Sequence, residues 1–465
     1  MAKRDKASIP VKIGDRPELI IESLAGGGEA IARHDGYTLF VPYAVPGDRI
    51  RAKVISTKPG YGRALIEEVL EAGPTRVVPR CPVFASCGGC QWQGLDYPGQ
   101  VVWKTRLVAE ALQRFGGIDP AGVLQPTIAS PEPWHYRNKV HWAVSKQGKQ
   151  WSIGLYEVRS HQIVDAETCG IQSPLINDIL AAVRVILTEI AIAPYDEATG
   201  RGWLRSIFAK AGHNTGETML GLVTRTADFS QRDRFIAAVR DRLPNLTTFV
   251  QNVHPSAGNK LMGDETIALF GPGVIREHVG PLEFEISARS FFQVNSATID
   301  LLYDQAAKAA GAETGPRVVD AYSGTGSIAL YLAARGAKEV VGIEIVNAAV
   351  EDAKASAARN GLSDKTRFVA GAVEDQLPKL VKDGLEADVV VLDPPRKGCE
   401  ASVLETVAAM KVPKVVYVSC DPTTLARDLK ILAGLGYRTE RVQPVDMFPQ
   451  TAHVENVATL VRDSQ

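Results

Sequence analysis

The pattern of hydrophobic and polar positions changes twice along the chain. From about Val11 to Ala72, short β-rich runs are separated by Gly, Pro and Asp turns, which predicts a small β-barrel. From Trp134 to about Val279, strand-like runs are mixed with helix-like runs near 175–192 and 230–243, which predicts an α+β domain. After Pro281, apolar strands alternate with helices, which predicts a parallel sheet wound with helices.

These changes divide the chain into three expected domains. Residues 1–73 are expected to form the barrel, 74–281 the central α+β domain and 282–465 the α/β domain. A length of 465 residues is sufficient for three domains of ordinary size. No stretch approaches the ~18 consecutive apolar residues of a membrane-spanning helix. We therefore expect a cytoplasmic protein without a membrane partner.

Charge is distributed unevenly, although the net charge is only −1. Before Leu282 there are 32 basic and 28 acidic residues, and from Leu282 onward there are 20 and 25. The front part can therefore carry a nucleic-acid face. Basic residues alternate with tyrosines in the barrel, as phosphate contact and base stacking require. These residues are Arg33, Arg49, Arg51, Lys53, Lys58, Arg63, Tyr37, Tyr43 and Tyr61.

A glycine-bearing turn follows the first apolar strand of the α/β domain. The segment RVVDAYSGTGSIALYLAARG is typical of a strand, a turn at Gly324 and Gly326, and a helix with free N–H groups at its start. Glu344 ends the next strand, where a carboxylate can accept hydrogen bonds from ribose hydroxyls. This arrangement predicts a ribose-bearing cofactor, for which NAD and S-adenosylmethionine are both candidates.

Two acidic residues favour S-adenosylmethionine. Asp320 stands directly before the glycine turn, where it would repel the pyrophosphate of a dinucleotide but attract a sulfonium cation. Asp393, in VVVLDPPRKG, ends another buried strand, and open α/β sheets bind their ligands at this edge. We therefore expect S-adenosylmethionine as the cofactor.

Cys420 is a candidate nucleophile because it ends the strand of KVVYVSCDPTTLARDLK, just before a helix. The helix N-terminus is expected to lower the pKa of this thiol, whereas Asp421 opposes that effect unless it caps the helix. The strand of Cys420 follows the strand of Asp393 along the chain. Both side chains are therefore expected to open onto one cleft.

A methyltransferase needs such a thiol when the target is the C5 carbon of a pyrimidine. Addition of the thiolate at C6 makes an enolate whose C5 can attack a methyl group, and a base must then remove the C5 proton. The C-terminal segment MFPQTAHVENVATLV supplies His453 and Glu455 as candidate bases.

Three of the six cysteines lie close together in CPVFASCGGCQWQ. Cys81, Cys87 and Cys90, with Cys169 as a fourth ligand, offer a set of thiolates that suits either zinc or an iron-sulfur cluster. Disulfides are not expected in a reducing compartment. The spacing predicts a metal site but leaves the element open.

In combination, these segments resemble the RNA 5-methyluridine (uracil-C5) methyltransferase family, and in particular its bacterial branch that modifies 23S ribosomal RNA. The resemblance spans nearly the whole chain, and the motifs occur in the order found in the family. The matching stretches are CPVFASCGGCQWQ, YRNKVHW, RSFFQVN, DAYSGTGSIAL, LDPPRKG, VYVSCDPTTLARD and FPQTAHVENV.

The resemblance implies a Rossmann-like class I S-adenosylmethionine-dependent methyltransferase domain, an N-terminal TRAM/OB-like β-barrel, and a central α+β domain that carries a 4Fe-4S cluster on Cys81, Cys87, Cys90 and Cys169. The resemblance also implies that the partner is RNA, and specifically 23S rRNA, as in the ribosomal branch of the family. It implies no obligate protein partner. By resemblance, Cys420 is the nucleophile, Glu455 is the base, and Phe291 stacks near the extracted target base. The cofactor pocket would contain Gln293, Tyr322, Glu344 and Asp393.

Three other functions compete with uridine C5 methylation of 23S rRNA. The same reaction on transfer RNA needs the same residues. Methylation of an exocyclic amine is suggested by the DPP sequence and needs no thiol. A non-catalytic RNA-binding maturation factor would use only the barrel and the cysteine cluster.

Overall fold

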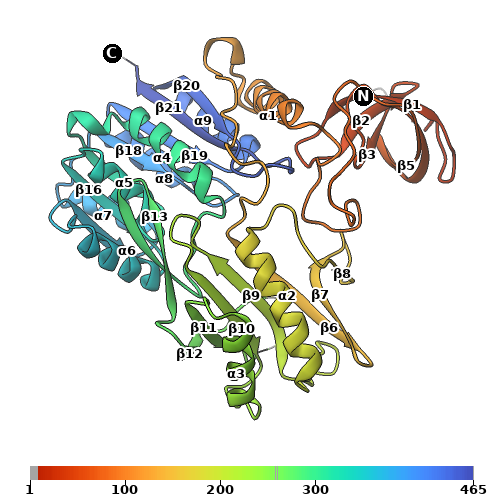
Figure 1. The fold of residues 1–465 in the computed structure, drawn as a ribbon. Coiled ribbons are helices and arrows are strands. Elements are labelled where there is room, and N and C mark those ends of the chain that lie inside the picture. Colours follow the sequence, from red (N-terminus) through yellow and green to blue (C-terminus); the bar gives the residue numbers. More distant parts are fainter. Residues whose placement is uncertain (1–8, 257, 259, 464–465) are drawn as a thin grey trace.

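A computed structural model describes residues 9–256, 258 and 260–463. The first eight residues of the expected barrel domain lie outside this part of the chain. Three larger sheets dominate the fold: a closed barrel, a seven-stranded central sheet and a seven-stranded C-terminal sheet. Figure 1 shows the barrel in red, the central sheet from orange to green, and the C-terminal sheet from teal to blue. Within the described ranges, no helix combines the length and apolar character needed to cross a membrane.

The barrel closes in the order β1-β2-β3-β5-β4 around a core of aliphatic and aromatic side chains. Burial alternates along its strands, because inward-facing and outward-facing residues alternate in a barrel. The strands are β1 (Glu18–Leu24), β2 (Ala30–His34), β3 (Tyr37–Val41), β4 (Arg49–Lys58) and β5 (Tyr61–Glu71).

The central sheet has the order β12-β11-β10-β9-β6-β7-β8, and only the β10–β11 pair in it is parallel. Apolar residues of α2 and α3 pack on it to form a separate core. The elements are β6 (Lys139–Gln147), β7 (Gln150–Tyr156), β8 (Ile163–Asp165), α2 (Pro174–Glu189), β9 (Leu204–Ala211), β10 (Thr218–Thr224), α3 (Arg232–Arg242), β11 (Thr248–Val253) and β12 (Glu265–Phe270).

A hairpin of β13 (Val274–Val279) and β14 (Leu282–Ser287) follows the central sheet. The expected boundary between residues 281 and 282 falls in the turn of this hairpin. Ile275 and Val279 of β13 and Phe284 of β14 belong to the same hydrophobic cluster as helices of the C-terminal domain. Both strands of the hairpin therefore pack with the C-terminal domain.

The C-terminal sheet has the order β17-β16-β15-β18-β19-β21-β20. The first five strands of this order are parallel, β21 is antiparallel to β19, and β20 pairs with β21. The elements are α4 (Ser296–Ala310), β15 (Arg317–Ala321), α5 (Ser327–Ala334), β16 (Glu339–Glu344), α6 (Asn347–Arg359), β17 (Thr366–Ala370), α7 (Val373–Lys382), β18 (Val389–Leu392), α8 (Ala401–Ala409), β19 (Lys414–Ser419), α9 (Pro422–Gly434), β20 (Tyr437–Val445) and β21 (Glu455–Arg462).

Helix α1 (Tyr97–Ala111) connects the other parts of the molecule and lies between the barrel and the C-terminal sheet (Figure 1). Asp96 caps its N-terminus by accepting a hydrogen bond from the Gly99 N–H. Its Trp103 and Leu107 pack into the barrel core, whereas Val108 and Ala111 pack into the core of the C-terminal domain. The helix therefore links the two cores.

Candidate active site

A cavity of ≈ 990 Å³ opens at the carboxyl ends of the parallel strands of the C-terminal sheet. It gathers residues from the 287–293 segment, the turn after β15, the end of β16, the DPPR segment after β18, the end of β19 and the start of β21. All six residues named from the sequence as catalytic or cofactor-binding line this cavity, and so do two further candidates. They are Gln293, Tyr322, Glu344, Asp393, Cys420 and Glu455, with Phe291 and His453.

The glycine turn and Glu344 form one side of the cavity. The Gly324 N–H donates to Glu344 Oε2 at 3.0 Å, and the Val346 N–H donates to Oε1 at 2.8 Å, so the carboxylate is held from both sides. Gly324 has φ +55°, and no neighbouring atom lies within 4 Å of where its Cβ would be. Its backbone is therefore not covered by other side chains. Tyr322 also has a positive φ, of 69°, a strained conformation that is common at functional sites.

Two buried carboxylates lie deeper in the same cavity. Asp320 is fully buried, and neither of its carboxylate oxygens has a hydrogen-bond partner within the described chain. Burial, and then the neighbouring Asp393, raise the pKa of Asp320 well above its usual range. Burial also raises the pKa of Asp393 to about 7. A bound cation would lower the cost of charging these groups, which fits the sulfonium and amino groups of S-adenosylmethionine.

Cys420 and Glu455 lie side by side at the end of two antiparallel strands. The register of β19 and β21 pairs Ser419 with Asn456, so the next positions along the two strands are Cys420 and Glu455. Opposite residues in such a pair have Cβ atoms ~4.5–5.5 Å apart. Glu455 is 5% exposed, whereas His453 is exposed. Of the two candidate bases, Glu455 is therefore the one that is shielded from solvent.

The expected lowering of the thiol pKa is wrong for the chain alone. Burial and the nearby Glu455 and Asp393 raise the pKa of Cys420 to about 11, although Arg396 opposes them. At the start of α9, Asp421 caps the helix by accepting from the Thr423 and Thr424 N–H groups at 2.8 and 3.2 Å. Capping does not remove its opposing effect, because the charge of Asp421 also raises the pKa of Cys420.

Arg396 lines the cavity and was missed in the sequence analysis. It follows the two prolines after Asp393, and its charge lowers the pKa of both Cys420 and Glu455 against the effect of burial. The sequence did contain a signal for Arg396, because in LDPPRKG a basic residue follows closely after Asp393, which ends a strand. Arg396 is the cation placed to favour the charged forms of both groups.

The four clustered cysteines lie in one neighbourhood away from the cavity. Cys90 is buried beside Tyr136 and Ile171, with Cys169 packed against them. Burial raises the pKa of Cys90 to about 12, and Cys169, Cys87 and Cys81 add to the shift. Across the described ranges, no group of three or more His, Cys, Asp or Glu side chains is arranged to hold a metal ion. The geometry thus does not show the predicted iron-sulfur site.

The expected RNA face of the barrel is partly occupied by internal contacts. Arg49 and Arg51 pair with Glu18 and with other barrel carboxylates, and Arg63 pairs with Glu29. Tyr37 is 8% exposed and donates to the Lys58 carbonyl, so its expected role in stacking on bases is wrong. Exposed ion pairs contribute little energy, so an RNA phosphate can still compete for these arginines.

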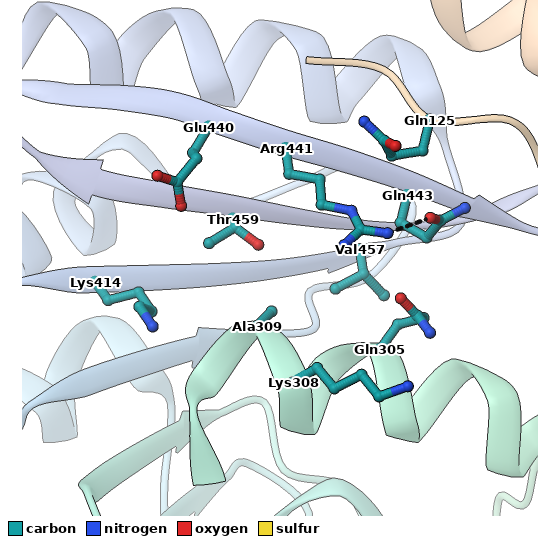
Figure 2. Close-up of a pocket in the computed structure, with 10 residues that line it drawn as sticks. All are labelled: Gln125, Gln305, Lys308, Ala309, Lys414, Glu440, Arg441, Gln443, Val457 and Thr459. Atoms are coloured by element: carbon teal, nitrogen blue, oxygen red, sulfur yellow. Dashed lines mark hydrogen bonds between the residues drawn. The ribbon is translucent and has the colours of Figure 1, made fainter. Parts of the chain in front are cut away.

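A second hollow, of ≈ 390 Å³, lies on the C-terminal domain outside the cavity described above. Figure 2 shows Lys308 on α4 facing strands β20 and β21, and Arg441 donating to Gln443, a bond of 2.8 Å. Val457 and Thr459 line it from the strand that begins with Glu455. None of the residues predicted from the motifs faces this hollow.

Relatives of the chain match it along nearly all of its length. An RNA methyltransferase of Halalkalibacterium halodurans, described as uncharacterized, is 44% identical over 98% of this chain and 99% of its own. One from Clostridium acetobutylicum is 40% identical over 98% of each chain. A TRAM domain model matches residues 10–66, which include most of the barrel.

Among solved structures, the chain is similar to the Pyrococcus abyssi tRNA (uracil-54, C5)-methyltransferase in complex with S-adenosyl-L-homocysteine. The TM-score is 0.75 with 25% identity, and the match covers 96% of this chain and 100% of that chain. The fold and the acidic cleft define an S-adenosylmethionine-dependent methyltransferase. The family model described as tRNA (Uracil-5-)-methyltransferase matches residues 280–463. The chain belongs to the RNA uracil-5 methyltransferase family.

Proposed function

We propose that this protein methylates C5 of a uridine in 23S ribosomal RNA, with Cys420 as nucleophile and Glu455 as base. The observation that carries the proposal is the register of β19 and β21, which pairs Ser419 with Asn456 and so brings the adjoining Cys420 and Glu455 together in the acidic cofactor cleft. A thiol beside a carboxylate matches the chemistry of C5, which needs both an attacking sulfur and an acceptor for a proton. The exocyclic-amine reaction would leave the thiol without a role.

Each residue has one task in this mechanism. The Cys420 thiolate adds to C6, and the electron pair moves to make C5 nucleophilic. S-adenosylmethionine, which Gln293, Tyr322, Glu344 and Asp393 would hold, supplies the methyl group that C5 takes. Glu455 then accepts the C5 proton, the C5=C6 bond re-forms, and Cys420 leaves as the thiolate. Phe291, 67% exposed at the cavity, is placed to stack on an extracted base.

A transfer RNA is the second candidate substrate, and a specific observation favours it. The structurally similar Pyrococcus abyssi protein is described as a tRNA (uracil-54, C5)-methyltransferase, and it matches 96% of this chain. The ribosomal proposal rests instead on the resemblance to the branch that has both a barrel and a cysteine cluster. The two proposals share every catalytic residue.

The two substrates can be separated by mapping 5-methyluridine in RNA from cells with and without the protein. We expect the loss of modification at a uridine of 23S rRNA, and its return when the protein is restored. Purified protein with labelled cofactor should methylate 23S transcripts in preference to tRNA transcripts. Loss of the mark from tRNA alone would instead establish the second candidate.

The pH dependence of turnover should report Glu455. Burial and Asp393 raise the pKa of this carboxyl to about 8, so at neutral pH most of it is protonated and cannot accept a proton. We expect kcat, which includes removal of the C5 proton after methyl transfer, to rise as the pH increases through about 8. Initial rates measured across this range, in buffers of constant ionic strength, test it. A flat or falling profile contradicts the assignment.

We also propose that Cys81, Cys87, Cys90 and Cys169 hold a 4Fe-4S cluster. All six cysteines of the chain are free, and these four lie close enough together that their charges raise the pKa of the Cys87, Cys90 and Cys169 thiols. Each iron of a tetranuclear cluster takes one thiolate, so its ligands need not converge on one point as they do around zinc. The donor set therefore fits the larger group.

Anaerobically purified protein should be brown and bind about four irons per chain. Changing Cys90 to Ser should remove most of this iron, because a buried thiolate ligand is lost. Cys399, buried in a different core, offers a matched control whose change to Ser should leave the iron content unaltered. Stoichiometric zinc without visible absorption would refute the cluster.

A further inference from the structure

We propose that Lys104 and Asp446 form a positioning pair that holds Glu455 for removal of the C5 proton. This inference rests on the proposed function, because it takes Glu455 as the base. Lys104 belongs to α1, outside the C-terminal sheet, whereas Asp446 directly follows β20. Both side chains are 0% exposed, and Lys104 Nζ lies 2.5 Å from Asp446 Oδ1.

The segment 446–454 leads directly into Glu455, the first residue of β21. It joins β20 to β21, and Val445 at its start is paired with Glu455 at its end. Asp446 is bonded directly to Val445, so its position bears on the strand pair that includes Glu455. Phe448 and His453 of the same segment line the cleft, so the segment also forms part of the cavity wall.

Most side-chain hydrogen bonds to Asp446 and the residues after it come from helix α1. Tyr97 donates to Asp446 Oδ2 at 3.0 Å, and the Phe448 N–H donates to Oδ1 at 3.1 Å. Lys104 Nζ also donates to the Phe448 carbonyl at 2.9 Å. Both oxygens of the carboxylate and the next turn of the segment are thereby tied to helix α1.

A second set of contacts fixes the middle of the segment. Gln450, with a positive φ of 69°, exchanges two hydrogen bonds with Gln100 of α1, of 2.8 and 3.0 Å. Its carbonyl accepts from the N–H groups of Gln91 and Trp92, each at 3.0 Å, next to Cys90. Ala452 packs in the barrel core. The segment before Glu455 is thus shaped by the barrel, the cysteine segment and α1 together.

The energetics favour a positional role over a purely stabilising one. Burying two charges costs about as much as their attraction returns, and an apolar pair of similar volume often gives equal stability. A buried ion pair does, however, define one geometry. Cys420 follows the last residue of β19, next to the cap of α9, and none of the contacts described above involves it. Disturbing the pair should therefore affect the proton step more than the attack of the thiol.

The test is to look for an enzyme that stops after methyl transfer. We would combine Lys104→Met with Asp446→Asn, so that no unpaired buried charge remains, and react the protein with ordinary uridine-containing RNA and methyl-labelled cofactor. We expect turnover to fall roughly tenfold to hundredfold, as for a displaced catalytic group. A labelled covalent protein-RNA band should accumulate on denaturing gels, normalised to folded protein. Glu455→Gln provides the reference band.

Two further variants separate positioning from general loss of stability. Leu187→Ala, in the core of the central domain, destabilises the chain without touching the segment and should give no band above wild type. Tyr97→Phe removes a hydroxyl that donates to Asp446 and accepts from the Ser130 N–H, and it should give a weaker band than the double variant; it carries the test if the double variant does not fold.

Two results in the double variant would overturn the positioning pair: wild-type turnover, or slow turnover without accumulation of the band. Either result would leave Glu455 as the base. If the double variant does not fold, a Tyr97→Phe enzyme without any excess band overturns the pair equally. If Glu455→Gln itself gives no band, the base assignment fails, and the pair fails with it.

Discussion

Replacing Cys420 by Ala should abolish methyl transfer to uridine, with a loss of at least about 10³-fold in turnover. C5 of uracil is too weak a nucleophile without the sulfur at C6, and no neighbouring group can substitute for a covalent nucleophile. The cavity itself should survive, because Cys420 is only partly buried and Ala is smaller. The variant should therefore still bind cofactor, and equilibrium binding measured beside turnover would separate the two effects.

A transcript containing 5-fluorouridine sharpens this test. Fluorine at C5 cannot leave as a proton does, so the adduct between sulfur and C6 persists after methyl transfer. Wild-type protein should form a cofactor-dependent covalent complex through Cys420, and Cys420→Ala should not. Cys399→Ala changes a cysteine on the neighbouring segment after β18, and it should still form the complex. Methyl transfer that survives in Cys420→Ala would indicate an exocyclic amine as the target.

The raised pKa of Cys420, about 11, changes how its activation is understood. In the chain alone, burial and then the nearby carboxyl groups of Glu455 and Asp393 disfavour the thiolate. The charge of Arg396 and the positive charge of bound S-adenosylmethionine both favour it. We therefore expect cofactor binding to lower the pKa of Cys420.

Local patterns were sufficient to predict much of the C-terminal domain. The strand, glycine turn, helix and acidic strand end around Gly324 and Glu344 lie within one stretch of sequence, and the structure joins them by the bond from the Gly324 N–H. The ends of β18 and β19 bring Asp393 and Cys420 to the same edge, because neighbouring parallel strands end together. These inferences needed only the hydrophobic periodicity that marks where each strand and helix begins and ends.

Features that depend on distant contacts were not predictable in this way. Strand β2 is a five-residue run between two turns, too short to give a clear alternation. The bond from Lys104 to Asp446 joins residues 342 positions apart, and nothing in the periodicity of α1 marks Lys104 as buried. The pKa of Cys420 depends first on burial and then on Glu455, which comes from a different strand.

Changing Glu455 to Gln should stop the reaction after the methyl group has been transferred. Gln is nearly the same size but cannot accept the C5 proton, so the bond between Cys420 and C6 cannot be released by elimination. We expect turnover to fall at least about 10³-fold, while the first steps remain. Ordinary uridine-containing RNA should then be trapped as a methylated covalent complex, without any need for fluorine.

This outcome distinguishes the base from a residue that only shapes the cleft. Loss of a shaping residue would slow the attack of Cys420 as well, and no adduct would accumulate. His453, the other candidate, is exposed and two residues away, so His453→Gln is the matched comparison. It should slow turnover much less and leave no stable adduct. If the stable adduct appeared with His453→Gln and not with Glu455→Gln, the two assignments would have to be exchanged.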